Sequence, residues 1–223
     1  MIDYKLIRSN RKTVTIKITY DGTEVRAPHN TPLSVIDDFV QSKEDWIAEK
    51  SVIMQERSAN RKDFYVDYGH MIRYRGKKYP IKASDLHYGF DGSAFHIPPG
   101  LDPAAIKNYC ILFYNMYGSS VIEKKLNEFS ALMNTSYNGF RLTNAQKQWG
   151  SCNSKKVISF SRRLIMADDD LIDYVIIHEL AHTIELNHST RFWEIVENYM
   201  PDFRDRKARI DDLQKELMHE DWS

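Results

Sequence analysis

The sequence predicts an α+β fold in which a β-rich N-terminal portion, residues 1–100, precedes a more helical portion, residues 101–223. Two patterns lead to this prediction. Before residue 100, short segments alternate polar and apolar side chains and are separated by turn residues, which is typical of β-strands. After residue 100, apolar residues mostly recur every three or four positions, as in helices that pack on a core. A chain of 223 residues is long enough to bury such a core.

The N-terminal portion is expected to begin and end with strands. Residues 4–28 alternate in the strand manner, and Asp21-Gly22 is a typical hairpin turn. Residues 33–58 have apolar side chains at helical spacing and predict the one helix of this portion. Residues 64–98 return to short strands that end at Pro98-Pro99-Gly100. The pattern leaves open whether residues 1–100 form a separate lobe or extend the sheet of the second portion.

The second portion is expected to alternate helix, hairpin and helices. A long helix is predicted at 102–133, because Asp102 is a good N-cap and Pro103 is favoured at the first helical position. Residues 141–164 predict two strands around a turn at Gly150–Ser154. The remaining helices are expected at 168–186, 189–199 and 202–219.

The predicted helix at 168–186 contains the segment VIIHELAHTIELNH, residues 175–188. His178 and His182 are four residues apart and therefore lie on one face of the helix. Glu179 is one step around the helix, where its carboxylate can reach a water molecule on an ion held by the two rings. Buried polar groups without partners destabilise a protein by about 1–3 kcal/mol each, and a metal ion would give the rings a partner. The segment therefore predicts a metal site with a general base beside it.

A catalytic zinc ion usually has three protein ligands, so a third ligand is expected. His188 lies six residues after His182 and directly follows Asn187, which tolerates the left-handed conformation that ends helices. The chain can then turn back toward the ion, with Ser189 as the cap of the next helix. Glu185 is the alternative third ligand, but it would require the helix to continue. This reasoning favours His188.

Other residues near the motif have more than one interpretation. Trp149 either lines the cleft or packs in the core, and Cys152 is expected to be a small packed residue rather than a fourth ligand. Phe192 and Trp193 are expected to pack beneath the metal helix. Three residues are candidates for stabilising a developing oxyanion, and the sequence selects none of them: Arg162, Arg163 and Tyr199.

The composition of the chain indicates in which compartment the protein is expected and which partners are disfavoured. The 31 basic and 31 acidic residues cancel, so the net charge gives no argument for nucleic acid or a membrane surface. No stretch approaches the roughly 20 apolar residues of a membrane helix, the N-terminus does not resemble a signal peptide, and two cysteines make no disulfide framework. We therefore expect a cytoplasmic protein with no membrane partner. A nucleic-acid partner is disfavoured, and the basic residues 57–82 are where one would bind.

Several segments around the histidine motif match the pattern of a known family. They are Gln148–Cys152 (QWGSC), Arg162–Ile165 (RRLI), Ile172–His182 (IDYVIIHELAH), Asn187–Ser189 (NHS) and Phe192-Trp193. With the N-terminal hairpin and the helix around Trp46-Ile47, they resemble the YgjP-like metallopeptidase family over nearly the whole chain. This is a zincin-type family related to the WLM and SprT-like groups.

The resemblance implies a zincin-like core made of a long helix, a β-hairpin or sheet, the H-E-x-x-H helix and C-terminal helices. It also implies a zinc-dependent hydrolase with His178, His182 and His188 as ligands and Glu179 as the catalytic glutamate. The hypothesis is a metallopeptidase in which Glu179 activates a metal-bound water, with a peptide or protein substrate extended along the edge strand of the sheet. One alternative is a metal-dependent nucleotide pyrophosphatase or phosphohydrolase. A second is a non-catalytic binding module with a structural metal.

Overall fold

The computed structural model describes residues 2–19, 22–62 and 64–222, with the backbone alone at 56–62, and it confirms the α+β class. Two compact units are present, Met1–Phe64 and Tyr65–Ser223. This division falls well before residue 100, the boundary expected from the sequence. Backbone hydrogen bonds explain the difference, because Arg75 and Gly76 donate to the carbonyl oxygens of Ile165 and Met166. The strands before residue 100 are thereby joined to a segment about ninety positions later.

The first unit contains a three-stranded sheet made of β1 (Lys5–Ser9), β2 (Thr15–Thr19) and β3 (Gly22–Pro28). The order is β1-β3-β2, with β3 antiparallel to β2 and parallel to β1. The predicted hairpin is confirmed, since Thr19 pairs with Gly22. Asp21, expected in its turn, lies outside the described residues.

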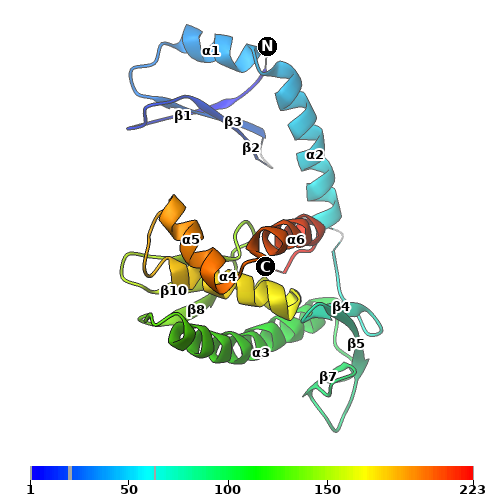
Figure 1. Cartoon of the computed structure of the whole chain (residues 1–223). Helices are drawn as coiled ribbons and strands as arrows, with labels where there is room; N and C mark the ends of the chain where they lie inside the picture. The colour runs from blue at the N-terminus through cyan, green and yellow to red at the C-terminus, as the bar shows by residue number, and fades with distance from the viewer. Residues whose placement is uncertain (1, 20–21, 63, 223) are drawn as a thin grey trace. The chain divides into compact units, whose positions relative to one another are not determined.

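The single helix expected at residues 33–58 is wrong, because the segment forms α1 (Leu33–Gln41) and α2 (Glu44–Lys62). The Ser42 hydroxyl donates to the Phe39 carbonyl oxygen at 2.7 Å, a local bond that competes with helix continuation. Both helices contribute to one core with the sheet, as Figure 1 shows for α1 above the strands. The fully or nearly fully buried residues of this core are Val25, Ala27, Ile36, Val40 and Ile47.

The second unit begins with a four-stranded sheet and the longest helix of the chain. The strands β4 (Met71–Tyr74), β5 (Lys77–Ala83), β6 (Gly89–Phe90) and β7 (Phe95–Ile97) have the order β4-β5-β7-β6. Helix α3 (Pro103–Leu132) follows, and the Asp102 side chain accepts the Ala105 N–H, so the predicted cap is confirmed. An aromatic cluster joins this sheet to α3, and it includes Tyr74, Phe90, Phe95, Phe113 and Tyr117.

The two strands expected at 141–164 are instead three strands and a 3-10 helix. They are β8 (Phe140–Thr143), β9 (Gly150–Cys152), β10 (Ile158–Ser161) and η1 (Arg162–Met166), and the sheet order is β8-β10-β9. The turn predicted at Gly150–Ser154 is therefore partly wrong, because its first three residues form an edge strand. The actual turn is centred on Asn153–Lys156, where the Asn153 side chain accepts the backbone N–H of Lys155 and Val157.

Three helices complete the chain: α4 (Asp169–Ala181), α5 (Thr190–Tyr199) and α6 (Phe203–Glu216), followed by the short η2 (Leu217–His219). Helix α4 ends five residues before the predicted end at residue 186. It contacts α3, α5, α6 and β9, so it is the central element of the second unit (Figure 1). Among the described residues, no helix is both long enough and apolar enough to span a membrane.

Candidate metal centre

Helix α4 is buried on nearly all sides, contains His178 and has His182 as its C-cap. After Ala181 the chain leaves the helix, while the N–H groups of His182 and Glu185 still bond to the carbonyl oxygens of His178 and Ala181. The expected left-handed Asn187 is wrong: among the described non-glycine residues, positive φ occurs at Arg75, Asn134 and Lys156. The loop instead turns at Asn187 through an N–H bond from Ser189 to its carbonyl oxygen.

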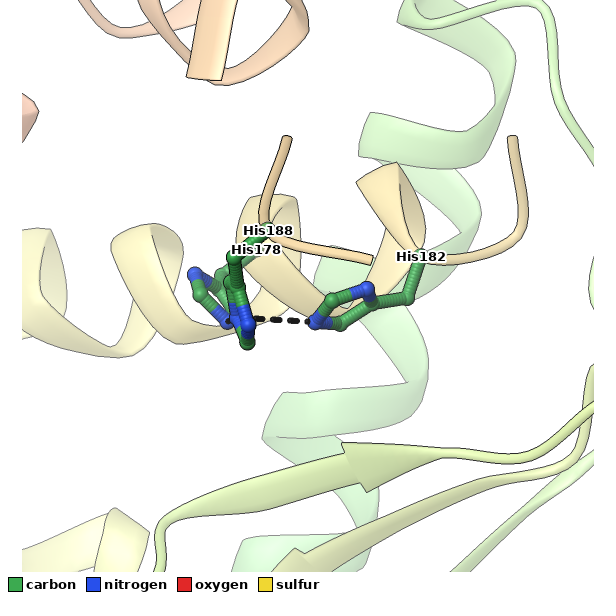
Figure 2. A group of neighbouring side chains, drawn as sticks. All are labelled: His178, His182 and His188. Atoms are coloured by element: carbon green, nitrogen blue, oxygen red, sulfur yellow. Dashed lines mark hydrogen bonds between the residues drawn. The ribbon is translucent and has the colours of Figure 1, made fainter. Parts of the chain in front are cut away.

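The three histidines converge on one point (Figure 2). The Nε2 atom of His188 lies 3.2 Å from Nε2 of His182 and 3.1 Å from Nε2 of His178, and ligand atoms of all three lie within 4.8 Å of one another. Two nitrogen ligands of a tetrahedral zinc ion, each about 2.0–2.1 Å from it, are about 3.3 Å apart. The spacing of the nitrogens therefore fits three ligands of a single tetrahedral ion.

The orientation of His182 depends on the backbone of Glu185. The Nδ1 atom of His182 lies 3.1 Å from the Glu185 carbonyl oxygen, so Nδ1–H is the donor and Nε2 keeps a free lone pair. The side chain of Glu185, the alternative third ligand, does not belong to the converging group. Glu185 thus contacts the site through its main chain.

Aromatic side chains of α5 hold the imidazole rings. Phe192 is fully buried and lies within 4.9 Å, between ring centroids, of His178, His182 and His188. Trp193 is only partly buried and stacks on His188 and on Phe203. The prediction that Phe192 packs in the core is confirmed, whereas Trp193 forms part of the wall around the rings. Ser189 caps α5 by accepting the Phe192 N–H, as expected.

The rings of His178 and His182 are in the protonation state that a metal ion requires. Burial, followed by the neighbouring His182 and His188, lowers the pKa of His178 to about 3, and burial also lowers the pKa of His182. Both rings are therefore neutral at physiological pH. A neutral imidazole has a lone pair for a metal ion, whereas a protonated one has none. These two rings therefore fit a divalent ion in charge as well as in spacing.

Glu179 lies beside the rings and under strand β9. It is only 4% exposed, and burial raises the pKa of its carboxyl group to about 8. Its Oε2 atom is buried and has no hydrogen-bond partner among the described residues. A Cβ atom placed on Gly150 would lie 2.5 Å from Oε1 of Glu179, so only glycine allows this close approach without movement of the carboxyl group. A buried carboxyl without a partner is unfavourable, unless a ligand or water completes the site.

A cavity of about 190 Å³ opens beside His178 and Glu179. Its other walls come from β9 and its neighbour Trp149, from the N-terminal half of α4, and from α6. The sequence argument missed Tyr174 and the α6 residues Lys207, Ile210 and Asp211. Tyr174 had a usable signal, because it is four residues before His178 on the same helix face. The residues of α6 are about thirty positions away and had no local signal.

Trp149 lines the cavity and is partly buried, which supports the cleft interpretation over the core one. The proposed oxyanion candidates are elsewhere: the Arg163 guanidinium donates to the Leu217 carbonyl oxygen, and neither Arg162 nor Tyr199 lines the cavity.

Two further expectations concern Cys152 and the basic stretch 57–82. Cys152 is on β9 and outside the converging group, and burial is the main cause that raises its pKa to about 11. In the stretch, Arg73 pairs with Glu216 and Arg75 pairs with Asp169 through two hydrogen bonds. These two guanidinium groups are therefore engaged with carboxylates of the same unit.

Three converging histidines at the end of α4 and in the loop after it, with a glutamate buried beside them and an open cavity, are the arrangement expected of a metal-dependent hydrolase. The model of the YgjP-like metallopeptidase domain matches residues 12–213, and the chain belongs to this family. It is therefore a metallopeptidase.

Two solved structures are similar to part of the chain. The metallopeptidase zymogen abylysin of Pyrococcus abyssi is 21% identical, with 40% of this chain and 90% of that chain covered and a TM-score of 0.38. The metallopeptidase zymogen jannalysin of Methanocaldococcus jannaschii is 23% identical, with 41% and 94% covered and a TM-score of 0.36. A comparison with curated proteins finds no match.

Proposed function

We propose that this metallopeptidase depends on zinc and that His178, His182 and His188 hold the ion. The observation that carries the proposal is the convergence of three Nε2 atoms at the spacing of a tetrahedral site. Imidazole nitrogen is a preferred ligand of zinc, and three protein ligands are typical of catalytic rather than structural zinc. A bound zinc ion supplies Lewis acidity, which polarises a carbonyl oxygen and makes a water molecule more acidic.

Glu179 is the proposed general base. Its carboxyl group is adjacent to the first ligand, faces the cavity, and has an oxygen without a partner among the described residues. Burial favours the protonated form of this carboxyl group, whereas a cation held by the adjacent histidines would favour the ionised form. In its ionised form, Glu179 would take a proton from the attacking water and return it to the departing amine. Tyr174 lines the same cavity, and burial raises the pKa of its phenol, so its hydroxyl stays protonated and can donate a hydrogen bond to developing negative charge.

The proposed substrate is an extended polypeptide. Strand β9 is at the edge of its sheet and pairs only with β10 among the described strands, which leaves one side for an added strand. Since Gly150 of this strand touches Glu179, a peptide paired along β9 would run past the carboxyl group. The adjacent cavity has room for one side chain, since a cavity of about 150 Å³ holds a benzene ring.

Elemental analysis of the purified protein beside the His178→Ala variant tests the metal assignment. We expect about one zinc per chain in the parent and almost none in the variant, because removal of one of three ligands leaves an incomplete site. Both proteins would then be incubated with unfolded casein and, separately, with nucleoside triphosphates. Peptide release by the parent alone supports the proposal. Release of phosphate or pyrophosphate without peptides would replace it with the nucleotide alternative.

A further inference from the structure

The first unit carries an apolar groove at an open edge of its sheet. Strand β2 is last in the order β1-β3-β2 and pairs with β3 on one side. A cavity of about 310 Å³ lies between the start of this strand and the junction of α1 and α2. Its lining is Val14, Thr15, Ile16, Phe39, Lys43 and Trp46.

Two aromatic side chains of the groove lining, Phe39 and Trp46, lie outside the core cluster of this unit. Trp46 is 41% exposed, although the next residue, Ile47, is only 4% exposed and belongs to the core. Phe39 is partly exposed, whereas Ile36 and Val40 on the same helix are buried. An exposed tryptophan beside a free strand edge is typical of a binding surface. The volume is about twice that of a cavity that holds benzene, so two side chains fit.

The charged residues of β2 and of the groove lining are both basic, Lys17 on the strand and Lys43 in the lining. Between Tyr4 and Tyr20 the sequence has five basic residues and no acidic one. On β2, Lys17 lies opposite Glu24, but the carboxylate of Glu24 is 2.6 Å from Arg26. Lys43 forms no ion pair with the described residues. The exposed acidic groups at the helix junction, Asp38, Glu44 and Asp45, are outside the groove lining.

The strand period determines how these charges and the groove are arranged. Val14, Ile16 and Ile18 pack toward the core, on the side of the helices, so Lys17 points to the opposite face of the sheet. A strand added along β2 would alternate in the same way. Its residues on the helix side would enter the groove between Phe39 and Trp46, and those on the other side would come next to Lys17.

We propose that the edge of β2 binds an extended polypeptide segment in which apolar and acidic residues alternate. The backbone of the bound segment pairs with β2, its apolar side chains fill the groove, and its acidic side chains lie next to Lys17. Lys43, in the groove lining, adds a second positive charge near the segment. A second copy of the chain fits less well, because two such edges would bring lysines together, an arrangement that discourages edge pairing. This site lies in the first unit, whereas the metal centre lies in the second.

The test is fluorescence anisotropy with the full chain carrying Glu179→Gln, so that no peptide is consumed. The probes are labelled nine-residue peptides with blocked ends: one alternates valine and glutamate, a second alternates valine and lysine, and a third is the acidic peptide N-methylated along one edge. We expect the acidic peptide to bind, more weakly at higher salt, and the other two to bind at least tenfold more weakly. Equal binding of the acidic and basic peptides, or no binding of the acidic one, would overturn the proposal.

Variants locate the binding on the protein. Trp46→Ala and Lys43→Glu should each weaken binding of the acidic peptide at least tenfold. Lys5→Glu, the same charge reversal on β1 at the other edge of the sheet, is the matched control and should change it less than twofold. Circular dichroism would verify that each variant is folded. If Lys5→Glu weakens binding as much as Lys43→Glu, the assignment to β2 is wrong. Binding of a single-stranded oligonucleotide in place of the peptide, or dimerisation lost in the Lys43→Glu variant, would assign the edge to another occupant.

Discussion

Helix α4 and strand β9 meet at Glu179, yet their sequences carry very different amounts of information. In α4 the spacing of His178 and His182 follows from helix geometry, so a pattern of five residues already places both rings on one face. In β9 the residues Gly150–Cys152 have little strand propensity, and pairing with β10 makes them a strand. Ligands on one helix can thus be found by local periodicity, whereas the strand that covers them depends on contacts between distant segments.

The largest expected effect concerns the loop after α4. His188→Ala should weaken zinc binding by more than 100-fold, because loss of a residue that only hydrogen-bonds to a metal ligand already weakens binding by up to about 100-fold. Activity should be lost with the metal. Glu185→Ala should retain zinc, because the main-chain carbonyl oxygen that orients His182 is unchanged. Competition with a chelator measures both affinities. If Glu185→Ala loses zinc and His188→Ala keeps it, the third ligand is Glu185.

A change at the base should separate catalysis from metal binding. Glu179→Gln is expected to lower kcat about 1000-fold, within the range for general acid–base groups, and to keep the zinc content of the parent. Thermal stability should not fall, since a neutral amide replaces a buried carboxyl that has no hydrogen bond at Oε2 among the described residues. Steady-state kinetics with a fluorogenic peptide is the measurement. Full activity in this variant would remove Glu179 from the mechanism.

The covering strand can be tested at its closest contact. Gly150→Ala would place a methyl group 2.5 Å from Oε1 of Glu179, so the carboxyl must move. A displacement near 1 Å of a catalytic group can reduce the rate about 100-fold, and we expect a loss of that size with zinc retained. Ser151→Ala, on the next and exposed position of β9, is the matched control and should keep activity within about twofold. Equal activities of the two variants would mean that β9 does not position the base.

The smallest effect is expected for a purely local feature. The Ser189 side chain caps α5 by accepting the Phe192 N–H at 3.3 Å, and loss of such a cap costs about 1 kcal/mol of unfolding free energy. Ser189→Ala should therefore lower stability by about this amount in urea denaturation. Thr190→Ala, one position later, serves as the control and should have a smaller effect. A loss of several kcal/mol would mean that Ser189 supports the metal loop as well as the helix end.

The same contrast between local and distant contacts explains which predictions about the fold were right. The Asp102 cap of α3, the Thr19–Gly22 hairpin and the cap of α5 each depend on residues a few positions apart, and all three are present. The single helix at 33–58 was wrong because the Ser42 hydroxyl competes for a carbonyl oxygen. A single side-chain hydrogen bond of this kind does not alter the spacing of apolar residues, so that spacing cannot predict where the helix ends.

The division between the two units after Phe64 and the walls of the cavity required the tertiary structure for a different reason. Strands β4–β7 belong to the second unit because the backbone N–H groups of Arg75 and Gly76, between β4 and β5, bond to carbonyl oxygens of η1. No sequence pattern within residues 64–98 predicts this pairing. Likewise, Lys207 and Asp211 are 2.7 Å apart on an ordinary charged face of α6, which packs beside α4. Such an i, i+4 pair is typical of a solvent-exposed helix face, so the sequence does not indicate that it lines a cavity.

By itself, the sequence of this protein determined the chemistry of the centre: two imidazoles on one helix face, a glutamate beside them and a third histidine within reach. The period of the α-helix and the short reach of a loop are properties of the local chain, and they do not depend on the rest of the molecule. The tertiary structure decided that β9 covers Glu179, that α6 completes the cavity, and that β2 is an edge strand among the described strands of the first unit. These features arise where burial and backbone pairing join segments that are far apart in the chain. Such contacts produce no periodic pattern of residues in either segment, so the sequence does not predict them.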